Sequence, residues 1–391
     1  MNSRWELEWR TRARGDDVSS VALWCIGFTG LALEPFWIGG IVDHLGVRAS
    51  LAGQFGALQL GCTGVVSLLV APRIGEWSRR RISVIGLAVT FLGSLYVSIF
   101  PTVSSVLVSR VLVGLGEGAT LAVAHAAIAN RRNADRLYAI SYLSLMAYAM
   151  LLYLTVPLLT ERMGIAVIFA VHAIVCIPGV LVAAKLIDAR PDNVPQRSTG
   201  ALARTGIAAL AAAAVFYISE GALWAYVERF GVRVGLSPAQ VGRAIAFALF
   251  LTIGGSFLAY VISTRFGRRG PIVVGILVLS GMSVVLPNAR TPFEYVFGVI
   301  LFQVAGIFVM IYITAFLGSL DSTGRVVAAA PASRGVGNTA GPAIAGVALA
   351  AYGYELIGWI ALAFYLTALL SFLCVIGRSA SGRQSSGIPP N

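Results

Sequence analysis

The chain has 391 residues, of which 58% are hydrophobic and 12% are charged. Because soluble domains carry about 25% charged residues, this composition excludes a water-soluble fold and predicts an all-α protein that crosses a membrane repeatedly. The net charge of +12 lies in short turns between apolar segments, so it indicates membrane topology and no nucleic-acid partner.

A transmembrane helix needs about 20 mostly apolar residues. By this criterion the sequence predicts twelve spans, at residues 19–42, 48–71, 82–100, 104–129, 137–160, 164–187, 204–229, 239–263, 271–288, 293–318, 327–352 and 355–377. They define five regions, which are a tail (1–18), a six-helix bundle (19–187), a linker (188–203), a second six-helix bundle (204–377) and a second tail (378–391).

Lys and Arg are distributed unevenly over the two sides of the predicted membrane. Of the 29 basic residues, 22 fall in the tails and in alternate connections, 5 in the other connections, and 2 (Arg110 and Arg243) inside spans. Since cytoplasmic loops carry the excess of basic residues, we expect both tails and the linker in the cytoplasm, and the protein in a bacterial-type inner membrane.

Two short basic segments, Pro72–Arg81 and Tyr260–Arg269, occupy matching places in the two predicted bundles. Arg268 and Arg269 follow Arg80 and Arg81 by 188 positions, close to half the length of the chain. Matched charged turns between matched apolar spans indicate two parallel repeats, an arrangement typical of secondary transporters.

Both basic segments resemble the cytoplasmic signature of the major facilitator superfamily, Gly-x-x-x-Asp-Arg-x-Gly-Arg-Arg. The matching residues that the resemblance implies as a gating motif are Glu76, Arg80 and Arg81 in the first copy, and Arg265, Gly267, Arg268 and Arg269 in the second. Both copies are degenerate, since Pro72 replaces the first Gly and Thr264 replaces the Asp of the second copy. The alternative is that these arginines only fix the topology.

The fourth predicted span contains Arg110, Gly114, Gly116, Glu117 and Gly118, which resembles a second pattern of the same family. The glycines should allow neighbouring helices to approach closely. An arginine in hydrocarbon costs at least ~2.5 kcal/mol, so Arg110 should face the bundle interior and have a partner. Arg110 and Glu117 are two turns apart, too far for direct contact, which makes Glu34 the better candidate partner for either.

Three carboxylates lie well inside spans, at Glu34, Glu117 and Glu220. A carboxyl group in a low-dielectric site favours its neutral form, as a proton carrier working near neutral pH requires. We therefore expect proton coupling at Glu34, Glu117 and Glu220, with Arg110 organising the charges. The alternative is that the carboxyls are neutral or paired with basic residues and only hold helices together.

The seventh span carries Tyr217, Glu220, Trp224 and Glu228 on one helical stripe, which suits an amphipathic or aromatic ligand, or a cation held by ring faces. Trp224 could instead anchor the membrane interface. The expected substrate-cavity residues are Gln54, Gln59, Tyr148, Tyr217, Glu220, Trp224 and Gln303. His125 and His172 are more simply interpreted as packing residues.

The eleventh span contains Gly337, Gly341 and Pro342, which resembles the Gly-Pro signature that antiporters of this family carry in the fifth span. Here the pattern is in a different helix, so it does not establish antiport. It predicts a kink that lets helices pack and flex.

The sequence contains no GxxxxGK[ST] nucleotide loop, so any energy for transport must come from an ion gradient. We expect a monomeric secondary transporter that moves a small organic molecule through the lipid bilayer by alternating access, driven by protons or another ion. The resemblance slightly favours export, of the drug or metabolite efflux kind. Uptake of an organic acid by symport or uniport, with Arg110 binding the carboxylate, is the alternative.

Two other classes of protein are less consistent with the sequence. A ligand sensor with the same fold would need an output domain, and a membrane-embedded enzyme would need a clustered catalytic set. The four cysteines lie in four different spans, and no Cys/His cluster occurs. We therefore expect no enzyme activity, no cofactor and no bound metal.

Overall fold

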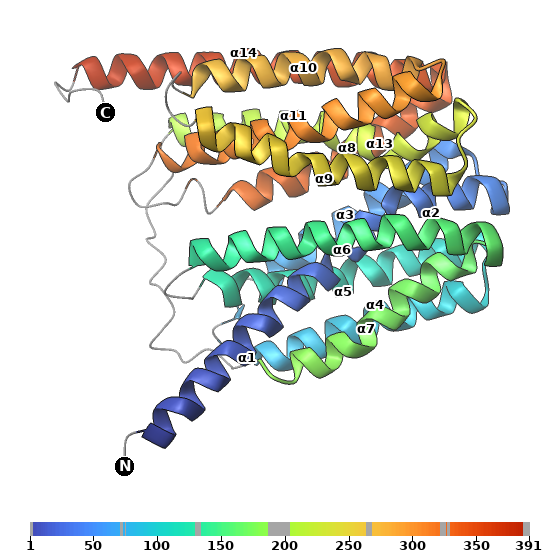
Figure 1. The fold of residues 1–391 in the computed structure, drawn as a ribbon, viewed down its shortest axis with the longest axis vertical. Helices are drawn as coiled ribbons and strands as arrows, with labels where there is room; N and C mark the ends of the chain where they lie inside the picture. Colours follow the sequence, from blue (N-terminus) through green and yellow to red (C-terminus); the bar gives the residue numbers. More distant parts are fainter. Residues whose placement is uncertain are drawn as a thin grey trace. The chain divides into compact units, whose positions relative to one another are not determined.

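The computed structural model describes residues 3–70, 73–74, 76–129, 134–186, 204–262, 268–320, 326 and 329–385. Long helices make up nearly all of these residues (Figure 1). In chain order they are α1 (Ser3–Gly27), α2 (Thr29–Leu45), α3 (Ala49–Val70), α4 (Arg79–Ile99), α5 (Val103–Ala129), α6 (Ala134–Met163), α7 (Ala166–Ala183), α8 (Arg204–Arg233), α9 (Pro238–Ile262), α10 (Arg269–Asn288), α11 (Pro292–Gly318), α13 (Ala330–Tyr352) and α14 (Tyr354–Ser385).

The twelve predicted membrane crossings are accounted for in the described residues. Eleven segments are long and apolar enough to cross a membrane, and the first, Gly15–Leu45, joins α1 and α2 into one span. The twelfth predicted span corresponds to α13, which is not among these eleven segments and which packs mainly on α8. The predicted all-α fold with twelve spans is therefore confirmed.

The ends of the chain differ from the predicted boundaries. Helix α1 begins at Ser3, inside the predicted N-terminal tail, and α14 continues to Ser385, beyond the predicted end of the last span. Neither extension contains a proline, the residue that would stop a helix most strongly. The predicted linker (188–203), together with Arg265 and Gly267 of the second basic segment, lies outside the described residues.

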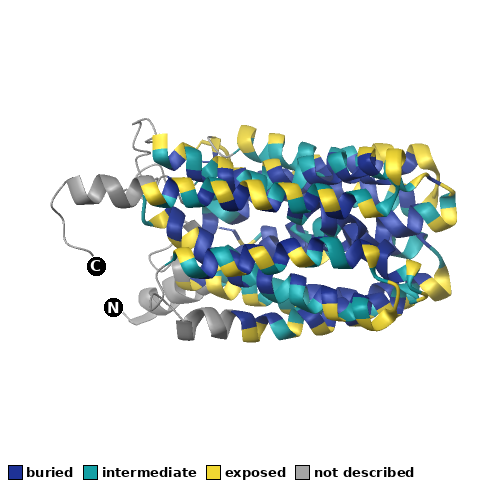
Figure 2. Ribbon diagram, turned by 90° about the horizontal axis from the view of Figure 1, so that it is seen from above, coloured by how far each residue is buried: buried dark blue, intermediate teal, exposed yellow. Residues whose placement is uncertain are grey.

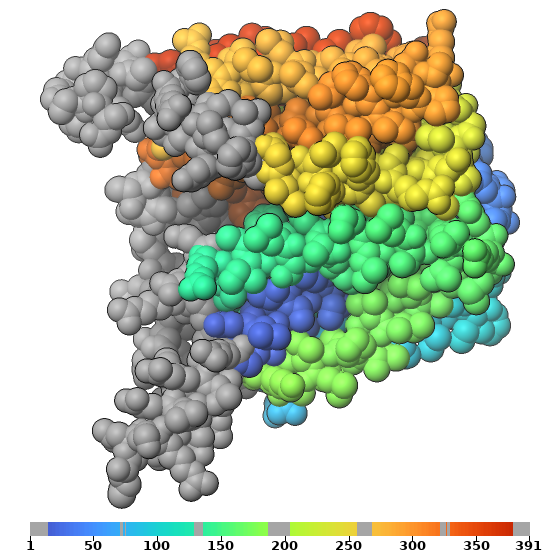
Figure 3. All heavy atoms as spheres, viewed as in Figure 1, coloured from blue at the N-terminus to red at the C-terminus, as the bar shows by residue number. Residues whose placement is uncertain are grey.

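The helices form two compact units. Unit 1 comprises residues 1–47 and 58–198, and unit 2 comprises residues 48–57 and 199–391, so that α3 contributes to both. In unit 1, α4 packs against α5 and α7, while α1 crosses α5, α6 and α7. In unit 2, α8 packs against α13 and α14, and the side chains of α9, α11 and α10 lie against one another in that order (Figure 3).

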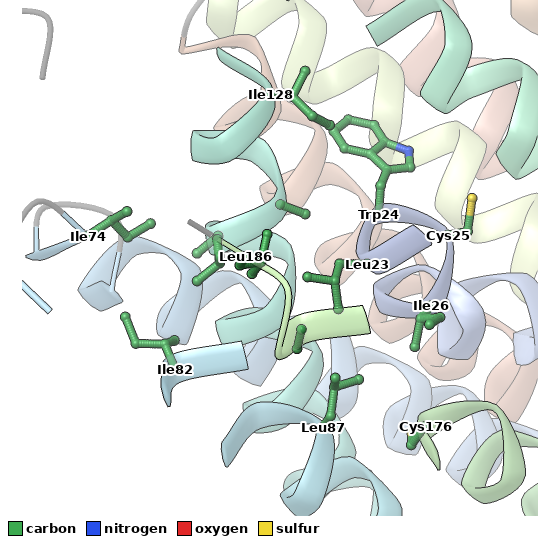
Figure 4. Close-up of a cluster of buried hydrophobic side chains, with 14 of the residues drawn as sticks. Leu23, Trp24, Cys25, Ile26, Ile74, Ile82, Leu87, Ile128, Cys176 and Leu186 are labelled. Atoms are coloured by element: carbon green, nitrogen blue, oxygen red, sulfur yellow. The ribbon is translucent and has the colours of Figure 1, made fainter. Parts of the chain in front are cut away.

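A hydrophobic cluster built from α1, α4, α5 and α7 forms part of the core of unit 1 (Figure 4). Leu23, Trp24 and Leu87 in this cluster are at most 1% exposed. Trp24 also packs edge-on or tilted against the rings of His125, Tyr138 and Tyr142, with centroids 4.3–5.5 Å apart. Such aromatic pairs add about 0.5–1.5 kcal/mol each to the gain from burial, so this end of unit 1 is firmly packed.

The outer faces of the helices carry large apolar side chains rather than charges. Figure 2 shows exposed residues recurring along the outer faces of the helices. Leu68, Ile85, Leu181, Val274 and Leu370 are each at least 60% exposed. In water such a surface would drive aggregation, whereas in a bilayer it faces lipid tails of the same polarity.

The three glycines of α5 allow close helix contacts, as predicted. A Cβ on Gly114 would clash with the Gln59 carbonyl oxygen and come within 2.7 Å of the Cys62 Cβ, and one on Gly118 would come within 2.5 Å of the Thr63 carbonyl oxygen. A Cβ on Gly116 would clash with the Gly86 carbonyl oxygen on the other side. Hence α5 fits between α3 and α4 only because these positions have no side chain.

The two basic segments lie at corresponding helix starts. Helix α4 begins at Arg79, with the Ser78 hydroxyl accepting a hydrogen bond from the Arg81 backbone N–H at 3.3 Å, and α10 begins at Arg269. Glu76, Arg80 and Arg81 are exposed, whereas Arg79 is 5% exposed. The shared position of the segments at the starts of α4 and α10 is consistent with a duplicated unit.

Candidate functional site

The candidate site in unit 1 begins at a break between α1 and α2. Phe28 has φ −95° and ψ 3°, and α2 starts anew at Thr29. A helix start leaves its first backbone N–H groups without partners in the helix and carries a partial positive charge. One of these groups, the Gly30 N–H, donates a hydrogen bond of 2.7 Å to the Glu117 carboxylate on α5.

Glu117 is 3% exposed and holds together four helices. Besides the bond from Gly30, it accepts a hydrogen bond of 2.8 Å from the Gln59 amide on α3, and its Oε1 lies 3.4 Å from the His172 Nε2 on α7. A Cβ on Gly30 would come within 2.5 Å of the Glu117 Oε1 and would clash with the Gln59 amide. Position 30 must therefore be glycine for this carboxylate to be bound.

Arg110 is completely buried, and both of its terminal nitrogens donate hydrogen bonds. Its Nη1 donates to the Gln59 side-chain oxygen at 2.9 Å, and its Nη2 donates to the Ser109 hydroxyl at 3.0 Å. The guanidinium also lies over the rings of Trp37 and Phe169, 4.8 and 5.2 Å from their centroids. Aromatic faces on a desolvated guanidinium contribute about 2 kcal/mol or more, so Arg110 is fixed in place.

Gln59 is the link between the two charges of α5. The sequence predicts that Arg110 and Glu117 are too far apart for direct contact, and the amide of Gln59 bridges them. Glu34 was the expected partner of Arg110 or Glu117, but it forms a hydrogen bond with neither of them. Glu117 is instead bonded to the Gly30 backbone, which the break at Phe28 makes available, and Gln59 bonds to both Arg110 and Glu117. Gln59 is 1% exposed, so it also does not line a cavity in this structure.

Glu34 lies beside this network without joining it. The residue is 2% exposed, and neither carboxyl oxygen has a hydrogen-bond partner among the described residues. It lies within electrostatic range of both Arg110 and Glu117. Leaving a buried carboxylate without a hydrogen bond costs several kcal/mol, so the protonated, neutral form is the one that fits this geometry.

We expect Gln59→Leu to destabilise the protein by about 1–3 kcal/mol, because the variant leaves one donor of Arg110 and one acceptor of Glu117 buried and unpaired. The measurement is the unfolding free energy of the purified protein in mixed micelles. Gln303→Leu is the matched control, since the half-buried Gln303 has no hydrogen bond among the described residues. Equal effects of the two substitutions would show that the bridge adds no stability.

The second group of predicted residues lies on α8 in unit 2. Glu220 is half-buried, and its carboxylate accepts a hydrogen bond of 2.6 Å from the Tyr365 hydroxyl on α14. Tyr217 and Trp224 lie on the same stripe, one turn to either side. Glu228, the last member of the stripe, is 1% exposed and bonded to Arg229 at 2.6 and 2.8 Å, so it is a buried paired group and not a ligand contact.

Arg334 on α13 supplies a positive charge near Glu220. Its guanidinium lies over the Tyr217 ring, 5.7 Å from the centroid, and its Nη1 is 3.8 Å from the sulfur of Met310 on α11. Its Nε is buried without a hydrogen-bond partner in the stretches of chain that the structure describes. Glu220 is within electrostatic range of Arg334, but the two do not form a salt bridge.

Two other predicted cavity residues and the predicted kink residues make structural contacts. The Gln54 amide donates to the Ala343 carbonyl oxygen at 2.8 Å, and the Tyr148 hydroxyl is 2.8 Å from the Thr29 hydroxyl. The predicted kink residues Gly337, Gly341 and Pro342 are buried. A Cβ on Gly341 would come within 2.5 Å of the Ala222 nitrogen, so these glycines bring α13 against the backbone of α8.

Sequence reasoning misses three residues of these sites. The sequence favours a packing role for His172, yet this residue lies against Glu117. In the sequence analysis Arg334 is only one of the basic residues that indicate topology, although it lies over the Tyr217 ring. Nothing in the sequence singles out Tyr365, which donates to Glu220. Arg334 could have been found, because an arginine inside a predicted span needs a polar environment. No group of three or more His, Cys, Asp or Glu side chains in the described ranges is placed to hold a metal ion.

The sequence profile described as "Major Facilitator Superfamily" matches residues 20–329, which is well over half of the chain. The chain belongs to the major facilitator superfamily. This membership makes it a multi-pass membrane protein and a secondary transporter of small molecules, and not an enzyme. No curated protein matches this superfamily member in sequence.

Solved structures of other transporters share the fold of this superfamily member. A peptide transporter POT in complex with sulfate has a TM-score of 0.74 at 13% identity, with 94% of each chain covered. The nucleoside transporter NupG has a TM-score of 0.70 at 13% identity, covering 93% of this chain and 99% of the other. The POT family transporter PepTSo has a TM-score of 0.73 at 12% identity, covering 96% and 99%. At such identities the likeness extends to the fold alone.

Proposed function

We propose that this transporter couples the movement of a small organic molecule to protons, and that Glu34 carries the proton. The observation that carries the proposal is the Glu34 carboxyl group, which is buried and without a hydrogen bond beside Arg110 and Glu117. Intramembrane ionisable groups are rare because they are costly, and they mark ion pathways. Of the three predicted coupling acids, Glu34 alone makes no hydrogen bond to the described residues, which favours it over Glu117 and Glu220.

Loss of the proton would change the contacts of Arg110. A charged Glu34 would attract the guanidinium, which is now bonded to Gln59. Gln59 in turn holds Glu117, and it belongs to α3, the helix that contributes residues to both units. Protonation of Glu34 is thereby coupled to the position of a helix that alternating access must move.

The competing uptake of an organic acid would use Arg110 to bind the substrate carboxylate. Here Arg110 has no exposed surface, and its two terminal nitrogens are bonded to Gln59 and Ser109. A substrate would have to displace these bonds and push aside the rings of Trp37 and Phe169. The geometry therefore favours Arg110 as a residue that positions the proton site.

The proposed function also includes direction and placement in the cell. We propose export in exchange for protons by a monomer in an inner membrane, with both termini in the cytoplasm. An even number of crossings puts both ends on the same side, and the excess of Lys and Arg in alternate connections supports the cytoplasm as that side. Exposed Glu76, Arg80 and Arg81 would act as the cytoplasmic gating motif.

The test uses purified protein in proteoliposomes with a pH-sensitive dye inside. A thermal-shift panel of amphipathic cations, aromatic acids, zwitterions and sugars first finds a stabilising ligand. A gradient of that ligand should then drive protons in the opposite direction. Proton flux in the same direction as the ligand would instead support the symport alternative, and ligand flux that ignores an imposed pH gradient would contradict proton coupling.

The Glu34→Gln variant separates coupling from binding. We expect it to bind the ligand and to exchange labelled for unlabelled ligand, while ligand-driven proton flux falls to the level of empty liposomes. Glu355→Gln is the matched control, because Glu355 is exposed and its flux should equal that of the unaltered protein. Undiminished proton flux in Glu34→Gln would exclude Glu34 as the carrier.

A further inference from the structure

Two half-buried side chains of opposite charge, Glu220 and Arg334, lie in unit 2 without forming a salt bridge to each other. Glu220 on α8 is bonded to the Tyr365 hydroxyl, and Arg334 on α13 contacts only a ring face and a sulfur among the described residues. Both side chains are half-buried, inside segments that cross the membrane. A charge in contact with lipid tails is costly, so both side chains are expected to face the interior of the protein.

The spacing of the two charges follows from how α8 and α13 pack. A Cβ on Gly337 would clash with the Tyr217 side chain, and one on Gly341 would meet Ala222, so the two helices run parallel and in register. Arg334 lies three residues before Gly337, and Glu220 lies three residues after Tyr217. At 1.5 Å per residue their Cα atoms therefore differ in depth by about 9 Å. The Arg334 side chain shortens this separation by reaching the Tyr217 ring.

Residues of α8 and α11 with apolar atoms lie next to both charges. A Cβ built on Gly306 of α11 would lie 3.5 Å from the Glu220 Oε2, at ordinary contact distance. Met310, one turn further along α11, contacts Arg334. The ring of Tyr217 and the thioether of Met310 would pack against an apolar body, while the two charges would bind its ends.

We propose that the substrate is a zwitterion whose cationic and anionic groups are several bonds apart, with the cation bound at Glu220 and the anion at Arg334. This inference rests on the proposed function, because it assigns the substrate class of the same transporter. A ligand of one charge would leave either Glu220 or Arg334 buried without a counter-charge, which is costly in a membrane. A zwitterion satisfies both groups at once.

The experiment measures binding of zwitterions of increasing charge separation by thermal shift and calorimetry. The probes are glycine, γ-aminobutyrate, ε-aminocaproate and para-(aminomethyl)benzoate, each with its methyl ester, which lacks the negative charge, and its N-acetyl derivative, which lacks the positive charge. We expect the two longest zwitterions to bind best, and to bind about tenfold to a hundredfold more tightly than either derivative, as one charge-assisted hydrogen bond contributes.

Two variants test which charged group of the ligand each residue binds. Glu220→Gln should remove the advantage of the zwitterion over the N-acetyl derivative, and Arg334→Gln its advantage over the ester. Arg290→Gln, at an exposed arginine, should leave all affinities unchanged. Binding of the esters or N-acetyl derivatives as tightly as the zwitterions, or zwitterion binding that survives both variants, would overturn the inference.

The two proposals fail differently. If a singly charged compound of the thermal-shift panel binds and moves protons while the zwitterions do not bind, the substrate class is wrong and the proton-coupled function stands. If a zwitterion binds with the expected dependence on Glu220 and Arg334 but moves no protons, the substrate class stands and the coupling is wrong.

Discussion

Arg110→Met should lower the unfolding free energy by about 3–5 kcal/mol, the range found when one member of a buried charge network is removed. Methionine fills a similar volume, but it leaves the buried Glu117 without the nearby charge of Arg110 and one acceptor of Gln59 unpaired. The measurement is unfolding by sodium dodecyl sulfate in mixed micelles. Transport should be lost as well, because the proton site loses the charge that organises it.

Two further variants separate the reasons for this effect. Arg110→Lys keeps the charge but loses the planar guanidinium and its stacking between Trp37 and Phe169. Its unfolding free energy should therefore lie between that of the unaltered protein and that of Arg110→Met. Arg290→Met, at an exposed arginine, should change the free energy by no more than about 0.5 kcal/mol. Arg110→Met and Arg290→Met behaving alike would contradict a structural role for the buried guanidinium.

Gly30→Ala should destabilise the protein and abolish proton coupling, although alanine is the better helix former. The added methyl group would occupy space that the Gln59 amide and the Glu117 carboxylate now fill, and overpacking of this kind costs about 1–3 kcal/mol. The bond between the Gly30 N–H and Glu117 would lengthen, and the partners of Glu117 would shift. The checks are the unfolding free energy and ligand-driven proton flux.

Gly64→Ala is the matched control on α3. A Cβ at Gly64 meets nothing within 4 Å. The substitution should therefore leave transport unchanged and stabilise the helix by up to about 1 kcal/mol, the difference in helix propensity between glycine and alanine. The two substitutions should therefore change the unfolding free energy in opposite directions. An unchanged unfolding free energy in Gly30→Ala would show that the Glu117 carboxylate is not tightly enclosed.

The sequence predicted the fold well because the bilayer imposes simple rules on it. Twelve apolar segments of sufficient length, the close-packing glycines Gly114, Gly116 and Gly118, and the charged residues Glu34, Arg110 and Glu117 inside spans could all be found from composition and spacing. Each feature reflects a free-energy cost that the bilayer imposes and that can be recognised from one segment alone: unpaired backbone groups in lipid, polar side chains in lipid, or large side chains where helices must pack closely.

The contacts between the charges could not be predicted in the same way. Phe28 has no special backbone preferences, and the flanking Gly27 and Gly30 do not by themselves predict the break that frees the Gly30 N–H, because glycine is frequent in membrane helices. Gln59 was expected to face a cavity, since a polar residue in a span has several possible roles until its neighbours on other helices are known. Arg334 and Tyr365 meet Glu220 from two different helices, a tertiary arrangement that periodicity along one helix does not contain.

The most direct test of the account is infrared difference spectroscopy of Glu34 in the reconstituted protein as the pH is changed. The carbonyl stretch of a protonated carboxyl group is well separated from carboxylate bands. A carboxyl band should appear on acidification, disappear at alkaline pH, and be missing from Glu34→Gln but present in Glu355→Gln. A spectrum of Glu34→Gln identical to that of the unaltered protein at every pH would contradict the claim that Glu34 takes up and releases the transported proton.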